Sequence, residues 1–547
     1  MPPRADLSAA AAATELAQSV IDNTASHLSD IEADQVLAYD LAHAASAVHN
    51  ARAMLEYGAK GDVEGRLACV FVADAVHDLA CRILGREELW SVPSGRLDPA
   101  MAFVGAWRDP ATLAAMAGET GPRHLDEDFT MVQDTFRRFA EEKVAPAAEG
   151  IHRENTDIPE EIIAGLAEMG GFGLSVPEDY GGFATGGVSD YMAMVIATEE
   201  LSRASLGAGG SLITRPEILT RALVKGGTEE QKKHWLPRLA SAETLAAVAV
   251  TEPDFGSDVA GLKVTATRAG EGWVINGVKT WCTFAARADV LMLLARTDPD
   301  RSKAHRGLSL FIVPKPAGDG HGFEFHQDRT RARDGVGAEA GAGGSAGAGR
   351  MEGRAIDTIG YRGMHSYEVA LENWWVPNDC LIGGSDGQGK GFYLQMEGFE
   401  NGRLQTAARA VGVMQAAYEA AWSYAENRVV FGAAVGDYQL TRAKLTRMAA
   451  IIQANRQFAY QVARLMAEGE GALEASMVKA YACRAAEWVT REALQIHGGM
   501  GYAEEFPVSR YFVDARVLSI FEGADETLAL KVIARRLTAA AQTQTKG

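Results

Sequence analysis

The stretch Thr251-Glu252-Pro253-Asp254-Phe255-Gly256-Ser257-Asp258 follows an apolar run that ends at Val250. We interpret the apolar run as a strand and the quoted stretch as the turn that ends it. A turn that contains glycine and serine can present backbone N–H groups and hydroxyls to a ligand. By itself, the stretch predicts a turn at the end of a strand and no particular chemistry.

A second motif, Asn276-Gly277-Val278-Lys279-Thr280-Trp281-Cys282-Thr283, lies further along the chain. The Asn-Gly pair predicts a tight turn, followed by a strand in which Trp281 and Thr283 share one face because side chains alternate. An aromatic ring beside a hydroxyl can hold a flat heterocycle. Packing of Trp281 in the core is the alternative interpretation.

Short β-branched and alternating runs around the two motifs predict a central sheet. The expected strands lie at Leu262–Thr267, Trp273–Ile275, Val290–Leu294 and Leu308–Val313. Further on, residues 335–349 read GVGAEAGAGGSAGAG. This low-complexity segment lacks the GK[ST] signature of a phosphate-binding loop, so we expect a flexible loop there.

Helical spacing of apolar residues characterises the start of the chain. A helix is expected from Glu32 to Tyr57, with Gly58 as its stop. A second helix is expected to be capped by Asp62 and closed by Gly85. The two helices are therefore predicted to form a hairpin.

The remaining segments are also mainly helical. Residues 90–124 are rich in proline and predict a linker with short helices, whereas residues 125–240 return to helical periodicity. Long periodic segments follow the sheet at Met396–Glu426, Gln439–Ala467 and Leu473–Ile496. Their lengths suit a four-helix bundle.

These patterns predict an α+β fold with four parts. We expect a helical extension with a linker over residues 1–120 and a helical domain over residues 121–245. A β domain is expected over residues 246–385, with the Gly/Ala-rich insertion at about 329–350, and a helical bundle over residues 386–547.

Composition excludes several classes of function. The 547 residues carry a net charge of −19, which argues against nucleic acid or an anionic membrane surface as the main partner. The five cysteines are widely spaced and form no CxxC pair, so neither a disulfide framework nor a metal site is indicated. No stretch approaches the ~18 apolar residues of a membrane span, and the alanine-rich start lacks the apolar core of a signal peptide. We therefore expect a cytoplasmic protein.

The run Ser519-Ile520-Phe521-Glu522-Gly523-Ala524-Asp525-Glu526 is the strongest indication of chemistry. Glu522 lies between hydrophobic neighbours and a glycine, so we expect a poorly solvated carboxylate, a setting that favours proton abstraction near neutral pH. Gly523 allows a ligand to approach the backbone closely. A glutamate at the start of a helix, without chemistry, is the alternative interpretation.

Together the motifs resemble the acyl-CoA dehydrogenase flavoprotein family, whose usual pattern includes TEPxxGSD and NGxKxWxT. The resemblance runs from about residue 125 to about residue 540. Further matching segments are Gly227–Lys232 before Leu236-Pro237, Arg428 with Phe431-Gly432 and Gln439, and Gln495–Gly501. The implied fold has an N-terminal helical domain, a central antiparallel β domain and a C-terminal four-helix bundle, here preceded by an extra helical extension.

The resemblance implies FAD as the cofactor. Thr251, Trp281 and Thr283 are implied to contact the flavin, and the other implied members of this cofactor site are Val250, Gly256, Ser257, Cys282 and Glu526. The residues implied to bind the FAD of a neighbouring subunit are Arg428, Phe431, Gln439, Gln495, Gly498 and Gly499. A homo-oligomer, either a dimer or a tetramer, follows from a cofactor that is shared between subunits.

The resemblance also implies a reaction. Glu522 would remove the α-proton of an acyl-CoA thioester while the β-hydrogen leaves as hydride to the flavin, and an electron-transferring flavoprotein would accept the electrons. Some members of the family place the base just before an arginine in an earlier helix, but here that position is Gly402, which cannot act as a base. The residues implied to lie near the acyl-CoA are Ser257, Glu400, Arg403 and Gly523.

Three features resemble a branch of the family that oxidises a short branched dicarboxylic acyl-CoA. They are the N-terminal extension, the Gly/Ala-rich insertion and the run Phe399-Glu400-Asn401-Gly402-Arg403. A free carboxylate on the substrate needs a cation or several donors, and Arg215 is our candidate. The alternative is a surface arginine or one that pairs with Glu217.

Other functions stay open at this stage. On the same fold, the chain could act on another short-chain or branched acyl-CoA, or as an acyl-CoA oxidase or flavin monooxygenase. From another class, it could be a non-catalytic acyl-CoA-binding scaffold whose N-terminal helices form the interaction module.

Overall fold

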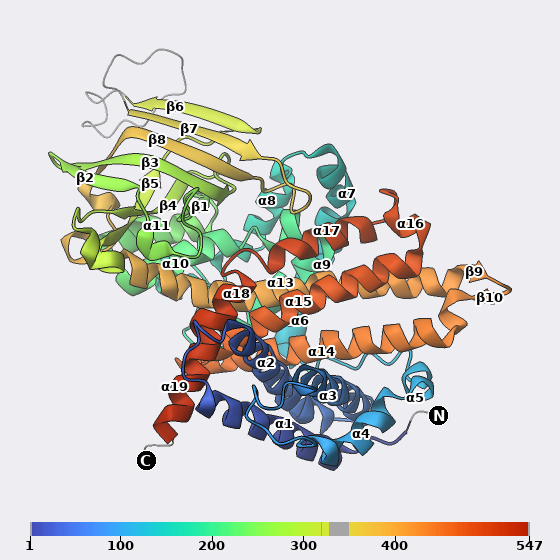
Figure 1. Cartoon of the computed structure of the whole chain (residues 1–547). Coiled ribbons are helices and arrows are strands. Elements are labelled where there is room, and N and C mark those ends of the chain that lie inside the picture. The colour runs from blue at the N-terminus through green and yellow to red at the C-terminus, as the bar shows by residue number, and fades with distance from the viewer. Residues whose placement is uncertain (1–2, 319, 328–348, 545–547) are drawn as a thin grey trace. The chain divides into compact units, whose positions relative to one another are not determined.

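The computed structural model describes residues 3–318, 320–327 and 349–544. The chain forms two compact units (Figure 1). Unit 1 contains Met1–Arg137, Thr198–Ala204 and Arg403–Gly547, and unit 2 contains Arg138–Ala197 and Ser205–Gly402. Most of the predicted low-complexity loop lies outside the described residues.

Unit 2 contains the central sheet, which has the strand order β1-β4-β2-β3-β8-β7-β6, with β5 paired to β4. The strands are β1 (Ala246–Ala249), β2 (Thr265–Ala269), β3 (Gly272–Thr283), β4 (Val290–Arg296), β5 (Leu308–Pro314), β6 (Gly322–Gln327), β7 (Gly349–Ile356) and β8 (Ser366–Pro377). Most neighbours are antiparallel, as expected, whereas β4 runs parallel to both β1 and β2. The predicted apolar runs form β4 and β5, whose residues are almost all buried because the sheet is covered by helices.

The predicted tight turn at Asn276-Gly277 is wrong. β3 continues through these residues and pairs with β8 on both sides of a bulge between Ile275 and Gly277. Gly277 has φ 135°, and a Cβ atom there would lie 2.7 Å from Val264, so glycine is required by both conformation and space. The strand bends at this point and does not reverse.

The α-helices of unit 2 are α7 (Ala145–Glu154), α8 (Glu160–Glu168), α10 (Thr214–Gly226) and α11 (Glu229–Ala240), together with the first parts of α9 (Val188–Ala204) and α13 (Gly391–Asn427). Of these, α10, α11 and α13 share an apolar core with the sheet. Leu219 and Leu239 from α10 and α11 share one buried cluster with Met292 and Leu310 from the sheet. α11 begins with a capping box between Thr228 and Gln231, which explains the start of this helix.

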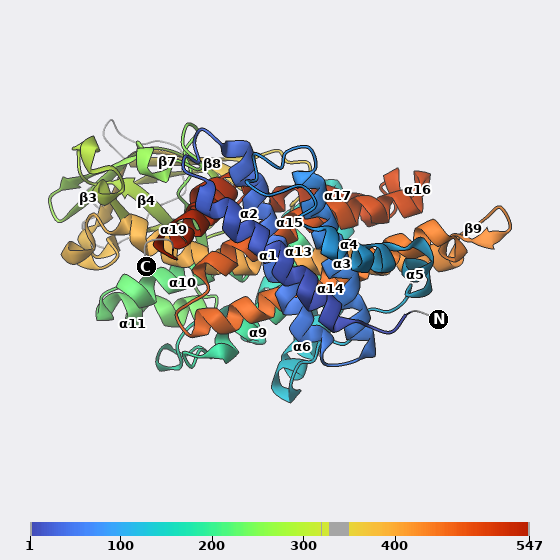
Figure 2. The ribbon, with the colours of Figure 1, turned by 60° about the horizontal axis from the view of Figure 1, so that its bottom comes forward.

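Unit 1 is helical. Its further helices are α1 (Leu7–His27), α2 (Gln35–Gly58), α3 (Asp62–Ile83), α4 (Asp98–Arg108), α5 (Pro110–Ala115), α6 (Glu127–Phe139), α14 (Gln439–Ala467), α15 (Ala472–His497), α16 (Gly499–Tyr502), α17 (Val508–Leu518), α18 (Asp525–Thr527), η10 (Leu528–Ala534) and α19 (Arg535–Gln544). Figure 2 shows α1, α2 and α3 lying across C-terminal helices of the same unit. The predicted hairpin, formed by α2 and α3, is confirmed.

Helix α1 was not predicted. It covers Leu7–His27, and its buried side includes Ala10, Ala13, Ala17 and Ile21. Alanine has the highest helix propensity, so the alanine-rich composition did carry a signal for this helix. Small buried side chains give a weak amphipathic pattern, which is why periodicity alone did not reveal it.

A buried ion pair connects the two motifs that define the sheet. Lys279 Nζ on β3 lies 2.9 Å from Glu252 Oε1 in the turn, and the two side chains are 0% and 5% exposed. The Glu252 carboxylate also accepts hydrogen bonds from the backbone N–H groups of Lys263 and Val264, at 2.7 and 2.9 Å. One carboxylate therefore holds the turn, the segment after it and the neighbouring strand together.

Replacing Lys279 with methionine should lower the free energy of unfolding by about 3–5 kcal/mol, because Glu252 would be left as a buried unpaired charge. Chemical denaturation measures the change. The matched control is Lys263→Met, which removes a pair with Asp254 whose two side chains are 50% and 72% exposed. The control should cost less than about 1 kcal/mol, and an equal loss in both variants would contradict the role assigned to Lys279.

Candidate active site

The loop that carries Glu522 lies in unit 1, between α17 and α18. Glu522 has φ 53° and Gly523 has φ 100°, so two successive residues adopt left-handed backbone conformations. Such a conformation is costly for glutamate and persists only where the surroundings hold it. The backbone geometry therefore singles out Glu522 within its loop.

Two residues of α13 hold the Glu522 side chain. Arg409 donates to Oε1 at 2.8 Å, and the Thr406 hydroxyl donates to Oε2 at 3.0 Å. The side chains of Glu522 and Arg409 are only 4% and 0% exposed. A buried carboxylate that is paired with a guanidinium and a hydroxyl is oriented and stabilised in its ionised form.

The expected source of burial was partly wrong. Ile520 is 55% exposed and cannot shield the carboxylate. Phe521 instead places its ring against the Arg409 guanidinium, whose Cζ lies 4.8 Å from the ring centroid. Sequence analysis missed Arg409 and Thr406, although their spacing of three residues places them on one face of a helix.

Helix α15 supports the same loop from another direction. Lys479 Nζ donates to the carbonyl oxygen of Gly523 at 2.6 Å. Arg403, which was predicted to lie near the acyl-CoA, is buried on α13 and donates to Ser476 Oγ on α15 at 3.2 Å. Glu400 precedes it on α13, is half-buried and belongs to unit 2.

The predicted flavin-contacting residues lie in unit 2, around the end of β3. The Thr280 N–H group donates to the Thr251 carbonyl at 2.8 Å, so β3 and the turn are joined beside Trp281. Trp281 is 54% exposed and has φ 57°, and the pairing of β3 with β8 shifts register at this point. Strict alternation does not hold here, because Thr283 is buried and forms a hydrogen bond of 3.1 Å with Ser366 Oγ.

The other predicted members of the flavin site differ in exposure. Gly256 and Ser257 are exposed in the turn, whereas Val250 and Cys282 are buried. Burial raises the pKa of the Cys282 thiol to about 12, so this thiol is protonated and serves as packing. An exposed indole, next to an exposed glycine and serine turn, is a surface that can hold a flat heterocycle.

A second group of predicted cofactor residues lies on exposed parts of unit 1. Arg428, Phe431 and Gln439 are exposed around the hairpin of β9 (Val429–Val430) and β10 (Ala433–Ala434), which joins α13 to α14 (Figure 1). Phe431 is fully exposed and has φ 48°. The remaining exposed residues are Gln495, Gly498 and Gly499 at the end of α15 and Glu526 in α18. Phe431 and the neighbouring Val429, which is 61% exposed, are the apolar residues that this hairpin presents to solvent.

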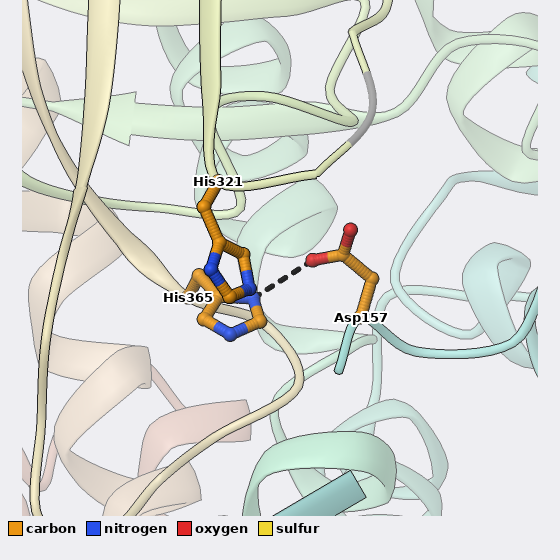
Figure 3. A group of neighbouring side chains, drawn as sticks. All are labelled: Asp157, His321 and His365. Atoms are coloured by element: carbon orange, nitrogen blue, oxygen red, sulfur yellow. Dashed lines mark ion pairs between the residues drawn. The ribbon is translucent and has the colours of Figure 1, made fainter. Parts of the chain in front are cut away.

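Sequence analysis missed a group of three residues in unit 2. Figure 3 shows Asp157, His321 and His365 facing one another, with His365 Nδ1 lying 2.8 Å from Asp157 Oδ1. The hydrogen bond from His365 lowers the pKa of Asp157. Since Ser366 follows His365 directly, this ion pair fixes the segment that meets Thr283.

The same three residues offer metal-ligand atoms that lie within 4.8 Å of one another. The residues come from three separate segments, so no spacing in the sequence could bring them together. The ion pair already accounts for the contact between His365 and Asp157, and the absence of a metal site stays a prediction.

Arg215, the proposed anchor for a substrate carboxylate, lies on α10. It is 6% exposed, so the interpretation as a surface arginine is wrong. Its Nη2 donates to the Tyr361 hydroxyl at 3.3 Å, and Tyr361 has φ 57°. A guanidinium inside unit 2 can bind an anion more strongly there than at the surface because water screens it less.

Comparisons with known proteins identify the family of this chain. Residues 126–243, 247–340 and 389–538 match the N-terminal, middle and C-terminal domains of acyl-CoA dehydrogenases. The chain is 38% identical to (2S)-methylsuccinyl-CoA dehydrogenase of Cereibacter sphaeroides, over 93% of this chain and 91% of that protein. This chain belongs to the acyl-CoA dehydrogenase family.

Solved structures of acyl-CoA dehydrogenases share the fold. A glutaryl-CoA dehydrogenase in complex with glutaryl-CoA is 30% identical, with a TM-score of 0.65, and covers 77% of this chain and 96% of its own. A glutaryl-CoA dehydrogenase from Mycobacterium smegmatis in complex with FADH2 is 26% identical, with a TM-score of 0.64, over 76% of this chain and 96% of its own.

The protein is therefore an FAD-dependent acyl-CoA dehydrogenase. The exposed Trp281 ring and the exposed turn at Gly256 and Ser257 fit a bound flavin in unit 2. Among helices of the described residues, none combines the length and hydropathy that crossing a bilayer requires.

Replacing Arg409 with methionine should lower the free energy of unfolding by about 3–5 kcal/mol, because Glu522 would become an unpaired buried charge. Thermal and chemical denaturation of the variant measure this loss. Adding Glu522→Gln to the same variant should recover part of it, since an amide carries no charge. A double variant less stable than Arg409→Met alone would contradict the assignment of an ionised Glu522.

Proposed function

We propose that this dehydrogenase converts (2S)-methylsuccinyl-CoA to mesaconyl-CoA, as part of the ethylmalonyl-CoA pathway, with Glu522 as the catalytic base. The observation that carries the proposal is the buried Glu522 carboxylate, which Arg409 and Thr406 orient on a strained loop. The similarity to (2S)-methylsuccinyl-CoA dehydrogenase over 93% of this chain supports the choice of substrate.

In the proposed reaction, one Glu522 oxygen takes the α-proton of the thioester. Each carboxylate oxygen can accept more than one hydrogen bond, so Glu522 can accept this proton while Arg409 and Thr406 keep it oriented. When bound, FAD accepts the β-hydrogen together with its electron pair. The Glu522 N–H group would donate to the thioester oxygen, which stabilises the negative charge that develops as the proton leaves.

The proposed substrate ends in a free carboxylate, which Arg215 would bind. A carboxylate in a desolvated pocket needs charge-assisted hydrogen bonds, and a guanidinium supplies them in a fixed geometry. Burial of Arg215 and its contact with Tyr361 hold the side chain in one place. We propose Ser257, Glu400, Arg403 and Gly523 as further residues near the acyl-CoA.

Subunit and redox partners follow from the same proposal. The exposed Arg428, Phe431 and Gln439 and the glycines at the end of α15 would bind the FAD of a neighbouring subunit in a cytoplasmic homo-oligomer, either a dimer or a tetramer. An electron-transferring flavoprotein would reoxidise the flavin. The fully exposed Phe431 and the exposed Val429 of the same hairpin are compatible with an interface there.

Substitution of Glu522 by glutamine should slow flavin reduction by (2S)-methylsuccinyl-CoA roughly 10²–10⁴-fold, because the amide cannot take the proton. The measurement is anaerobic bleaching of flavin absorbance in a stopped-flow instrument, with flavin content as the control for folding. Undiminished bleaching in the variant would exclude Glu522 as the base. Faster bleaching of the wild type by butyryl-CoA or isovaleryl-CoA would keep the base and overturn the substrate.

Substitution of Arg215 by glutamine should raise the KM for (2S)-methylsuccinyl-CoA at least about tenfold, as expected for loss of a charge-assisted hydrogen bond worth about 1.5–3 kcal/mol. Steady-state kinetics with an artificial electron acceptor measure this change. Residual turnover of butyryl-CoA, which has no terminal carboxylate, is the internal control and should be unchanged. An equal effect on both substrates would assign Arg215 to the fold and not to substrate recognition.

A further inference from the structure

The N-terminal extension lies outside the matched domains, which begin at residue 126. The solved glutaryl-CoA dehydrogenase aligns over 96% of its own length but over only 77% of this chain, so about a quarter of this chain has no counterpart in it. In unit 1, helix α2 of the extension packs against α14, α15 and η10. The extension thus contacts α15, which precedes the Glu522 loop in the sequence, and η10, which follows it.

Two residues of α2 reach the end of that loop. Tyr39 and His43 are one turn apart on the helix, and their ring centroids lie 4.5 Å apart. The Tyr39 hydroxyl donates to Asp525 Oδ2 at 2.5 Å, and His43 Nε2 lies 3.2 Å from the same oxygen. Asp525 is three residues after Glu522.

The charge states of Tyr39, His43 and Asp525 favour the hydrogen bonds between them. Burial raises the pKa of Asp525, but hydrogen bonds from His43 and Tyr39 outweigh it, and the pKa stays below its usual value. Burial lowers the pKa of His43, and burial together with the bond to Asp525 raises the pKa of Tyr39 to about 12. Two neutral donors therefore bind one ionised carboxylate, which is a strong form of hydrogen bond.

The Asp525 backbone closes the loop. Its N–H group donates to the Ser519 carbonyl at 3.1 Å, so that fixing Asp525 also fixes the span from 519 to 525. The C-terminal helices supply other attachments, from Arg409 and Thr406 to the Glu522 side chain and from Lys479 to the Gly523 carbonyl. The extension supplies the attachment at the C-terminal end of the loop.

We propose that helix α2 of the N-terminal extension positions the catalytic loop, with Tyr39 and His43 acting as positioning residues for Glu522 through Asp525. The proposal rests on the proposed role of Glu522 as the base. The left-handed backbone at Glu522 gives the physical reason: a strained conformation is kept only where the surrounding contacts over-determine it, and Tyr39 and His43 add to those contacts. The extension is then a working part of the enzyme.

The test combines Tyr39→Phe with His43→Ala in the full-length flavoprotein. Because small displacements of a catalytic group can cost up to about 10²-fold in rate, we expect kcat to fall between about tenfold and a hundredfold, with KM changed less than about twofold. The kinetic isotope effect from deuterium at the substrate α-carbon should rise, since proton removal becomes slower. Amide hydrogen exchange in the peptide that covers residues 519–527 should become faster.

Two matched variants separate positioning from general loosening of the extension. Asp40, the neighbour of Tyr39 on α2, pairs with Arg82 and Arg86 at 2.5 and 2.8 Å, and within the described part of the chain it forms no hydrogen bond or ion pair with residues 519–525. Asp40→Asn should therefore leave kcat and the isotope effect unchanged. The second variant is the single substitution His43→Gln, with Tyr39 unchanged. Glutamine retains a hydrogen-bond donor near the position of Nε2, so kcat should stay within about threefold of the wild type.

Each outcome decides between the hypotheses. Unchanged kcat and exchange in the double variant, while Glu522→Gln is inactive, would overturn the positioning role and leave the base in place. Equal losses in the double variant and in Asp40→Asn would also overturn it, because any weakening of the extension would then suffice. An active Glu522→Gln variant would overturn the proposed function itself, whereas faster exchange at residues 519–527 in the double variant alone would still establish the structural link.

Discussion

The buried pair of Lys279 and Glu252 is the interaction on which the cofactor side of this enzyme depends. A turn such as residues 251–258 has few side chains of its own to hold it, and Glu252 ties it to backbone N–H groups and to β3. The two charges cannot separate without leaving one of them buried and unpaired. The pair thus explains why β3 contains a fully buried lysine, and it holds the turn beside the strand that carries the exposed Trp281.

The Glu522 loop is also held by a buried ion pair, formed with Arg409, but this pair has a different purpose. As the proposed base, Glu522 must be shielded from water and still be ionised, and hydrocarbon neighbours alone would favour its neutral form. Arg409 and Thr406 resolve this conflict, because they compensate the charge of Glu522 inside the protein. The arrangement also requires an unfavourable backbone at Glu522, which Gly523 and its bond from Lys479 make tolerable.

The N-terminal extension gains a function in this view. In this chain, α2 contributes Tyr39 and His43 at the end of the Glu522 loop. Strain at a catalytic residue is retained only where the surrounding structure over-determines it. Additional helices are one way to supply that support, and they also allow the extension to affect the rate without contacting the substrate.

Much of this protein follows from local sequence. The alternating and helical periodicities predicted β4, β5, the α2–α3 hairpin and the long C-terminal helices, because each depends on neighbours within a few turns or residues. Glu522 and Trp281 were singled out as candidate site residues from their immediate surroundings, and their roles stay predictions. The sequence did not predict the bulge at Gly277, which exists because β8 lies beside β3, or the partners Arg409 and Asp157, which are distant in the chain from the residues they hold. Local pattern determines which elements form and which side chains are unusual; only tertiary structure decides which charges meet, because burial brings together residues that no spacing relates.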